Sequence, residues 1–147
     1  MAKGYLILEN GKTFAGELLG SSTEPVIGEA VFNTSMNGYQ EIITDPSYAG
    51  QILTLTYPTI GNYGCGEYGS EAKYPALRGL VIKEASTVNG HYQSKWDFDK
   101  FIEKYNITCL SGVDTRELTR VLRMHGTMGA VISPDIEAKE ELIEAAR

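Results

Sequence analysis

The stretch that decides the fold is residues 32–64, which read FNTSMNGYQEIITDPSYAGQILTLTYPTIGNYG. β-Branched and apolar residues fill two short runs, 41–44 and 52–57, and such runs are typical of strands. Asn-Gly, Asp-Pro-Ser and a Pro-initiated, glycine-containing segment separate or end the two runs, and these are turn-forming residues. We therefore expect strand, turn, strand and turn in succession.

Polar side chains able to touch a ligand gather in the turns of this stretch. Loops held by a rigid sheet are common places for binding residues. A ligand site is therefore expected here before anywhere else in the chain. The side chains in question are Asn33, Thr34, Ser35, Gln40, Glu41, Thr44, Asp45 and Ser47.

The same stretch resembles a known family. Residues 29–62, with FNTSMNGYQEIITDPSY and LTYPTIGN as the densest parts, are similar to the N-terminal domain of the small, glutamine-hydrolysing subunit of carbamoyl phosphate synthetase. The segments RGLVI at 78–82 and DTRELTRVLR at 114–123 resemble the same family, so the similarity covers residues 4–132. No turn rule or hydrophobic period demands that order of residues, which makes the resemblance specific.

The resemblance implies a fold and a domain division. The fold would be α+β, a swivelling β/β/α-type domain with mainly antiparallel strands and two to three helices. Residues 1–133 would form the small-subunit N-terminal domain. Residues 134–147 would form a helical linker toward a C-terminal amidotransferase domain that this sequence does not contain.

The resemblance also implies a function. In that family the C-terminal domain hydrolyses glutamine with a cysteine, a histidine and a glutamate, and the ammonia passes to a large, ATP-using subunit that makes carbamoyl phosphate from bicarbonate for arginine and pyrimidine synthesis. The partners would be the large subunit and glutamine, and no catalytic residue and no cofactor would lie in this chain. The alternative is a free-standing binding or scaffolding domain of the same fold, and the sequence that follows Arg147 in the parent gene would separate the two.

Ser47 is the one residue to which the resemblance gives a role, because a serine in the family's Asp-Pro-Ser turn helps to bind glutamine. From the residues alone, Ser47 could equally be a turn residue that follows a proline of fixed φ. Arg116, Arg120 and Arg123 have the spacing i, i+4 and i+7 and form one cationic stripe on a helix. That stripe is either a solvated face or a partner interface, where arginine is enriched.

Composition bounds the class of protein. A chain of 147 residues with 42% hydrophobic and 22% charged residues can form one domain with a core. A net charge of −6 argues against nucleic acid and against anionic membrane surfaces as partners. No apolar run reaches 18 residues and the apolar start is too short for a signal peptide, so we expect a cytoplasmic protein with both cysteines reduced.

Hydrophobic patterns predict the remaining elements. Residues 4–9 and 13–19 flank Asn-Gly and should form a β-hairpin, and further strands are expected at 26–32, 78–84, 107–110 and 128–132. A helix capped by Ser94 should bury Phe98, Phe101, Ile102 and Tyr105. Residues 135–147 should form a last helix. Strands precede helices overall, which favours α+β over a doubly wound sheet.

The helix after Asp114 carries the clearest end signals. Asp114 and Glu117 match a capping box, and Gly126 is placed to end the helix. Its core-facing stripe should be Leu118, Val121 and Leu122.

Two other motifs predict no chemistry. The glycines at 64–69 match G-x-G-x-x-G, but they do not follow a strand directly and no helix leaves them, so the dinucleotide reading fails on context. Cys65 has no evident base beside it, and His91 and His125 read as a loop residue and a helix-end residue. No cluster has the spacing of a metal site.

Overall fold

The structure is a computed structural model and describes residues 2–19, 24–34, 46–56, 77–83, 102–103, 105–137 and 139–146. Several sequence predictions lie outside these residues: the strand at 41–44, the turn at 37–38, the loop at 58–75 with Cys65 and its glycines, His91, and the helix start at Ser94.

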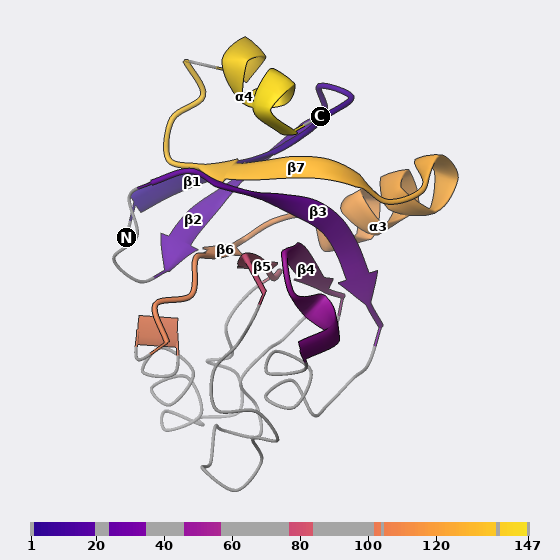
Figure 1. The fold of residues 1–147 in the computed structure, drawn as a ribbon, viewed down its shortest axis with the longest axis horizontal. Helices are drawn as coiled ribbons and strands as arrows, with labels where there is room; N and C mark the ends of the chain where they lie inside the picture. Colours follow the sequence, from indigo (N-terminus) through magenta and orange to yellow (C-terminus); the bar gives the residue numbers. More distant parts are fainter. Residues whose placement is uncertain are drawn as a thin grey trace, which may run out of the picture.

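The described strands close into a seven-stranded barrel with the order β1-β2-β6-β5-β4-β3-β7 (Figure 1). The chain adds a 3₁₀ turn η1 and two helices, α3 and α4. The bounds are β1 Ala2–Leu8, β2 Thr13–Leu19, β3 Val26–Asn33, η1 Pro46–Tyr48, β4 Gln51–Leu55, β5 Gly79–Val81, β6 Cys109–Ser111, α3 Thr115–His125, β7 Met128–Ser133 and α4 Lys139–Ala146.

Strand directions divide the barrel into two halves. The pairs β1–β2, β1–β7, β2–β6 and β3–β7 are antiparallel, whereas β3–β4, β4–β5 and β5–β6 are parallel. The predicted α+β class fits this arrangement. The expectation of mainly antiparallel strands understates the parallel half, because local patterns report that a strand is buried but not which strand it pairs with.

The first hairpin forms as predicted. Gly11 has φ 93°, a conformation that glycine adopts without strain. Its N–H donates to the Leu8 carbonyl at 2.8 Å, and the Leu8 N–H donates to the Lys12 carbonyl at 2.9 Å. The turn therefore sets the register in which Tyr5 faces Ala15.

The parallel half is buried on both faces. Ile52 and Val81 point into the barrel and join the cluster that α3 covers, while Leu53 and Leu80 point outward into a second cluster. Parallel strands covered on both sides are buried at consecutive positions, which is the pattern of β4 from Ile52 to Leu55. Ile102 is buried in the second cluster and Tyr105 is half-buried against it, as predicted.

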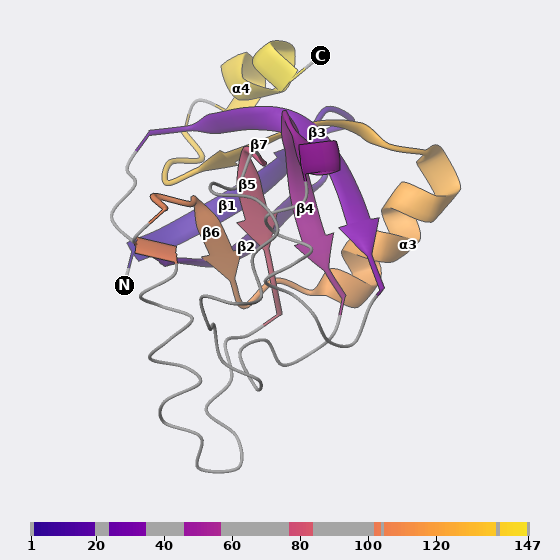
Figure 2. The ribbon, with the colours of Figure 1, turned by 60° about the horizontal axis from the view of Figure 1, so that its bottom comes forward.

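Helix α3 lies beside β3 at the end of the sheet where β3 and β4 finish (Figure 2). Its apolar stripe of Leu118, Val121 and Leu122 is buried in the barrel cluster, as predicted. Asp114 caps the helix by accepting the Glu117 N–H at 3.1 Å, and Gly126 with φ 78° follows its last residue. The capping box is only half formed, because the Glu117 carboxylate instead contacts Lys12 and Arg120.

Helix α4 begins at Lys139, four residues later than predicted. The Asp135 N–H donates to the Ser133 hydroxyl at 3.1 Å, and the Glu137 N–H donates to Asp135 Oδ1 at 2.8 Å. Such local side-chain bonds compete with helix formation and hold these residues in turns.

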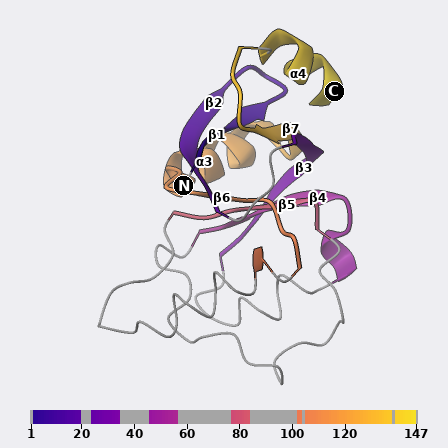
Figure 3. The same ribbon diagram turned by 90° about the vertical axis from the view of Figure 1, so that its left-hand side faces the viewer.

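Helix α4 packs back onto the barrel, against β7, β1 and β3 (Figures 1 and 3). At Gly129 in β7 the approach is so close that a Cβ would lie 1.7 Å from the Ala146 carbonyl oxygen. The division of the chain at residue 133 stays a prediction.

Candidate functional site

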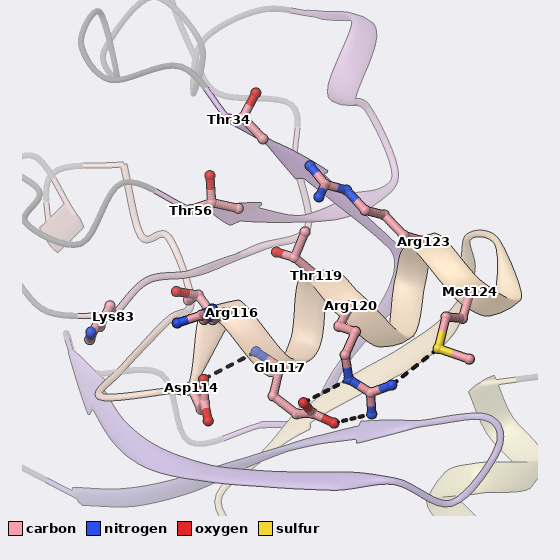
Figure 4. Close-up of a pocket in the computed structure, with 11 residues that line it drawn as sticks. Thr34, Thr56, Lys83, Asp114, Arg116, Glu117, Thr119, Arg120, Arg123 and Met124 are labelled. Atoms are coloured by element: carbon pink, nitrogen blue, oxygen red, sulfur yellow. Dashed lines mark hydrogen bonds and ion pairs between the residues drawn. The ribbon is translucent and has the colours of Figure 1, made fainter.

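A pocket of about 680 Å³ lies between α3 and the carboxyl ends of parallel strands (Figure 4). Thr34, Thr56 and Lys83 follow β3, β4 and β5 directly or after one residue. Carboxyl ends of parallel strands meet at one edge of a sheet, and such edges are common ligand sites. The helix supplies the opposite wall with Asp114, Thr115, Arg116, Glu117, Thr119, Arg120, Arg123 and Met124.

Three cations of the pocket have no ion-pair partner among the residues that the structure describes. These are Lys83, Arg116 and Arg123, all with exposed side chains. The Arg123 guanidinium lies over the Phe32 ring, 5.3 Å from its centroid. A cation–π contact of this kind fixes the plane of the guanidinium and leaves its N–H edge available.

The fourth cation, Arg120, is already engaged. Arg120 Nε donates to Glu117 Oε2 at 2.9 Å, and Lys12 Nζ contacts Glu117 Oε1 at 3.1 Å. The hydrogen bond from Arg120, and then that from Lys12, lower the Glu117 pKa from 4.5 to about 2. Glu117 is therefore ionised and its charge is compensated by these two neighbours.

Two threonines differ in how their hydroxyls are used. Thr56 Oγ1 donates to the Asn33 carbonyl at 3.2 Å. Thr119 is 7% exposed, and its buried Oγ1 has no hydrogen-bond partner within the described part of the chain. A buried hydroxyl without a partner is unusual in a folded protein and calls for an explanation.

The structure brings the predicted arginines together but leaves Ser47 elsewhere. Arg116, Arg120 and Arg123 all line the pocket, which Ser47 does not. Ser47 is exposed in η1, next to Tyr48, whose hydroxyl accepts an N–H from Asn33 Nδ2 at 2.9 Å. That bond ties η1 to the end of β3 and presents Ser47 at the surface.

Sequence reasoning missed Lys83, Thr56 and Thr119 and included only Thr34 among the strand-end residues. The sequence signal for these residues is a polar residue just after a buried strand. That signal indicates a shared site only when the strands are known to be parallel neighbours, which the sequence alone does not show.

The described part of the chain holds few other features that could carry chemistry. No three His, Cys, Asp or Glu side chains gather there in a way that could hold a metal ion, and none of its helices is both long and apolar enough to cross a membrane. Cys109 is a buried cysteine in β6. His125 is exposed in the last turn of α3, where a cation is favoured by the helix dipole.

A mixed, closed barrel with a cation-lined pocket at its strand ends defines the chain as an α+β domain with a candidate polar site. Comparison with known proteins then identifies the family. The family model described as "Carbamoyl-phosphate synthase small chain, CPSase domain" matches residues 6–132, so the chain belongs to this family.

Curated relatives carry matching names. The chain is 47% identical over 147 residues to the carbamoyl phosphate synthase small chain of Oceanobacillus iheyensis, covering all of this chain and 40% of the relative. It is 48% identical over 139 residues to the pyrimidine-specific small chain of Halalkalibacterium halodurans, and 46% identical over 138 residues to the arginine-specific small chain of Bacillus subtilis. Each of these two alignments covers 94% of this chain and 38% of the relative. The chain thus spans about 40% of the length of the relatives it matches.

Proposed function

We propose that this chain acts as the N-terminal domain of the small subunit of a glutamine-dependent carbamoyl phosphate synthetase. The observation that carries the proposal is the family match over residues 6–132, joined by relatives named as arginine-specific and pyrimidine-specific small chains. The complete enzyme would hydrolyse glutamine and use the ammonia, bicarbonate and ATP to make carbamoyl phosphate in the cytoplasm. The barrel would then be the swivelling β/β/α domain of that subunit.

The proposed role of the domain is to complete the glutamine site, not to carry the reaction. Ser47 supports this role because η1 places it at the surface, where a second domain could meet it, and the Asn33–Tyr48 bond holds the turn. A hydroxyl positioned in this way donates to a substrate oxygen or accepts from a substrate amine.

The test of this role is Ser47→Ala in a full-length small chain that carries this sequence. A binding hydroxyl contributes about 0.5–1.5 kcal/mol, so KM for glutamine should rise about two- to tenfold with kcat little changed. Thr127→Ala, at another exposed hydroxyl, is the control and should leave KM unchanged. An unchanged KM with a lower Tm for Ser47→Ala would make Ser47 a turn residue only.

The chain by itself should release no ammonia from glutamine, because the catalytic residues would belong to the C-terminal domain. A glutaminase assay on the purified 147-residue chain tests this. The proposal would be contradicted if the chain hydrolysed glutamine, if Cys65→Ala abolished that activity, and if Cys109→Ala, at a buried position in β6, left it intact. The reaction would then belong to this domain.

The second proposed role is docking on the large subunit through the exposed side of α3. Met124 is 66% exposed there, next to Arg120, and Arg116 and Arg123 lie along the same helix. Calorimetry of the chain with the large subunit should show binding. Changing all three arginines to Ala should weaken that binding. Arg78→Ala, which removes a cation outside the pocket, should leave it unchanged. No binding at tens of micromolar would favour the free-standing module instead.

A further inference from the structure

We propose that the pocket between α3 and the ends of β3, β4 and β5 binds a small oxyanion, a phosphate or carboxylate group. This inference does not rest on the glutamine or docking roles, because it concerns a ligand that the chain alone should bind. It is built on the cations, the unpartnered hydroxyl and the shape of the site.

The described residues that line the pocket carry a charge opposite to that of the chain. The whole chain carries −6, yet Lys83, Arg116, Arg120 and Arg123 line the pocket against Asp114 and Glu117. Glu117 is neutralised by Lys12 and Arg120, and Asp114 lies at the start of α3, where it caps the helix. Among the described lining residues the uncompensated charge is therefore positive, and it lies in a concave region where the field of fixed charges is focused.

Thr119 provides the most direct evidence for a ligand in this pocket. Threonine within a helix usually bonds back to the carbonyl four residues earlier, and Thr119 makes no such bond. Figure 4 shows its hydroxyl directed to the side of the helix that faces Thr56 and the strand ends. The side chain is more than nine-tenths buried and also lines the pocket, so a ligand oxygen seated in the pocket would give this hydroxyl the partner that it lacks.

Arg123 supplies the matching charge at the same end of the pocket. Its guanidinium is held by the Phe32 ring and points toward Thr34 (Figure 4). A guanidinium with a fixed plane presents two N–H groups side by side, the geometry that suits phosphate and carboxylate oxygens. Arg116 lies two helical turns away, about 10 Å along the axis, so the same ligand would touch it only through a second anionic group.

The experiment is calorimetric titration of the 147-residue chain with inorganic phosphate and, separately, with succinate. Ionic strength is held constant with sodium chloride, because screening alone changes weak electrostatic binding. The expected result is saturable binding of at least one anion at millimolar concentration. Saturation by phosphate but not succinate assigns the site to phosphate groups, and the reverse result assigns it to carboxylates.

Variants connect the binding to the pocket. Arg123→Gln should weaken binding about tenfold, the usual loss for one charge-assisted hydrogen bond. Thr119→Val should weaken binding about threefold while Tm stays the same or rises, because it removes a donor that the folded chain leaves unpaired. Arg78→Gln, outside the pocket, is the matched control and should bind as the unchanged chain does.

Two results would overturn the inference. The first is that neither anion binds above the sodium chloride control at about 50 mM, a concentration that reveals sites far weaker than the millimolar range. The second is binding that Arg123→Gln and Arg78→Gln weaken equally, which would indicate diffuse attraction to surface cations. Neither result bears on glutamine use, so failure here is distinct from failure of the proposed function.

Discussion

Adding a single methyl group at Gly129 should detach the end of α4 from the barrel. A Cβ at this position would lie 1.7 Å from the Ala146 carbonyl oxygen and 2.7 Å from the carbonyl carbon. Both atoms belong to the backbone, so no rotamer change relieves the overlap. The carbonyl must retreat by more than about 1 Å, because a Cβ tolerates no contact below 3.0 Å.

The cost follows from what α4 buries. If the helix end moves, Ala146 loses its place against β7 and the half-buried Leu142 and Ile143 lose part of theirs. Overpacking of this kind costs about 1–3 kcal/mol. For a chain of this size, a loss of about 2 kcal/mol lowers Tm by roughly 4–8 °C.

The assay is a double-mutant cycle read by thermal or urea unfolding. Gly129→Ala is made in the intact chain and in a chain that ends at Glu144, which lacks the carbonyl that causes the overlap. In the shortened chain the same substitution should be neutral or stabilising by about 0.5–1 kcal/mol, because glycine is the costlier residue within a strand. A coupling energy of about 2–3 kcal/mol is expected.

Equal losses of stability in the two chains would refute this reasoning. That outcome would show that Gly129 is needed for the strand itself, through its bonds to Glu9, and not for the approach of α4. Gly129 N–H donates to Glu9 Oε1 at 2.7 Å, and its carbonyl accepts the Glu9 N–H at 2.9 Å.

Two further predictions concern α3. Leu118→Ala should lower the free energy of unfolding by about 2–5 kcal/mol, because Leu118 is wholly buried. Met124→Ala, at an exposed position on the same helix, should change the free energy of unfolding by less than about 0.5 kcal/mol. Urea unfolding of both variants checks this, and similar losses in the two would contradict the assigned faces of the helix. Glu117, with its pKa lowered to about 2, binds fewer protons when folded than when unfolded, so its contribution to stability is present above about pH 4.5 and is lost as the pH falls toward about 2. A carboxyl-detected NMR titration should show that Arg120→Gln raises this pKa more than Lys12→Gln does, and the opposite order would contradict the assigned causes.

Local sequence signals predicted the elements whose causes are local. The Asn-Gly turn before Lys12, the Asp114 cap and the buried stripe of α3 all depend on residues within one or two turns of each other. The predicted start of α4 was wrong for a local reason too. The Ser133 and Asp135 side chains accept hydrogen bonds from backbone N–H groups and hold these residues in turns, so the helix begins later.

The pocket was not predictable from the chain in order. Thr34 and Lys83 are 49 positions apart in the sequence and come to one edge only because β3, β4 and β5 run parallel. Hydrophobic periodicity predicts that each strand is buried, but it does not show which strands are neighbours. The position of the site therefore cannot be deduced from it. The arginine spacing was visible, but its division into one engaged and two available cations depends on Lys12 and Glu117, which meet across the fold.

Closure of the barrel has a consequence for how the chain folds during synthesis. One edge of β1 pairs at once with its neighbour β2, but the other waits for β7, where Leu6 faces Ile132. At ribosomal rates of about 5–20 residues per second, that edge stays open for on the order of 10 s. Contacts this distant in sequence also place the chain among slow folders. The nascent domain therefore spends its first seconds with one edge of an apolar strand unpaired. In that state a chaperone would bind it, and the exposed edge of another nascent chain would pair with it.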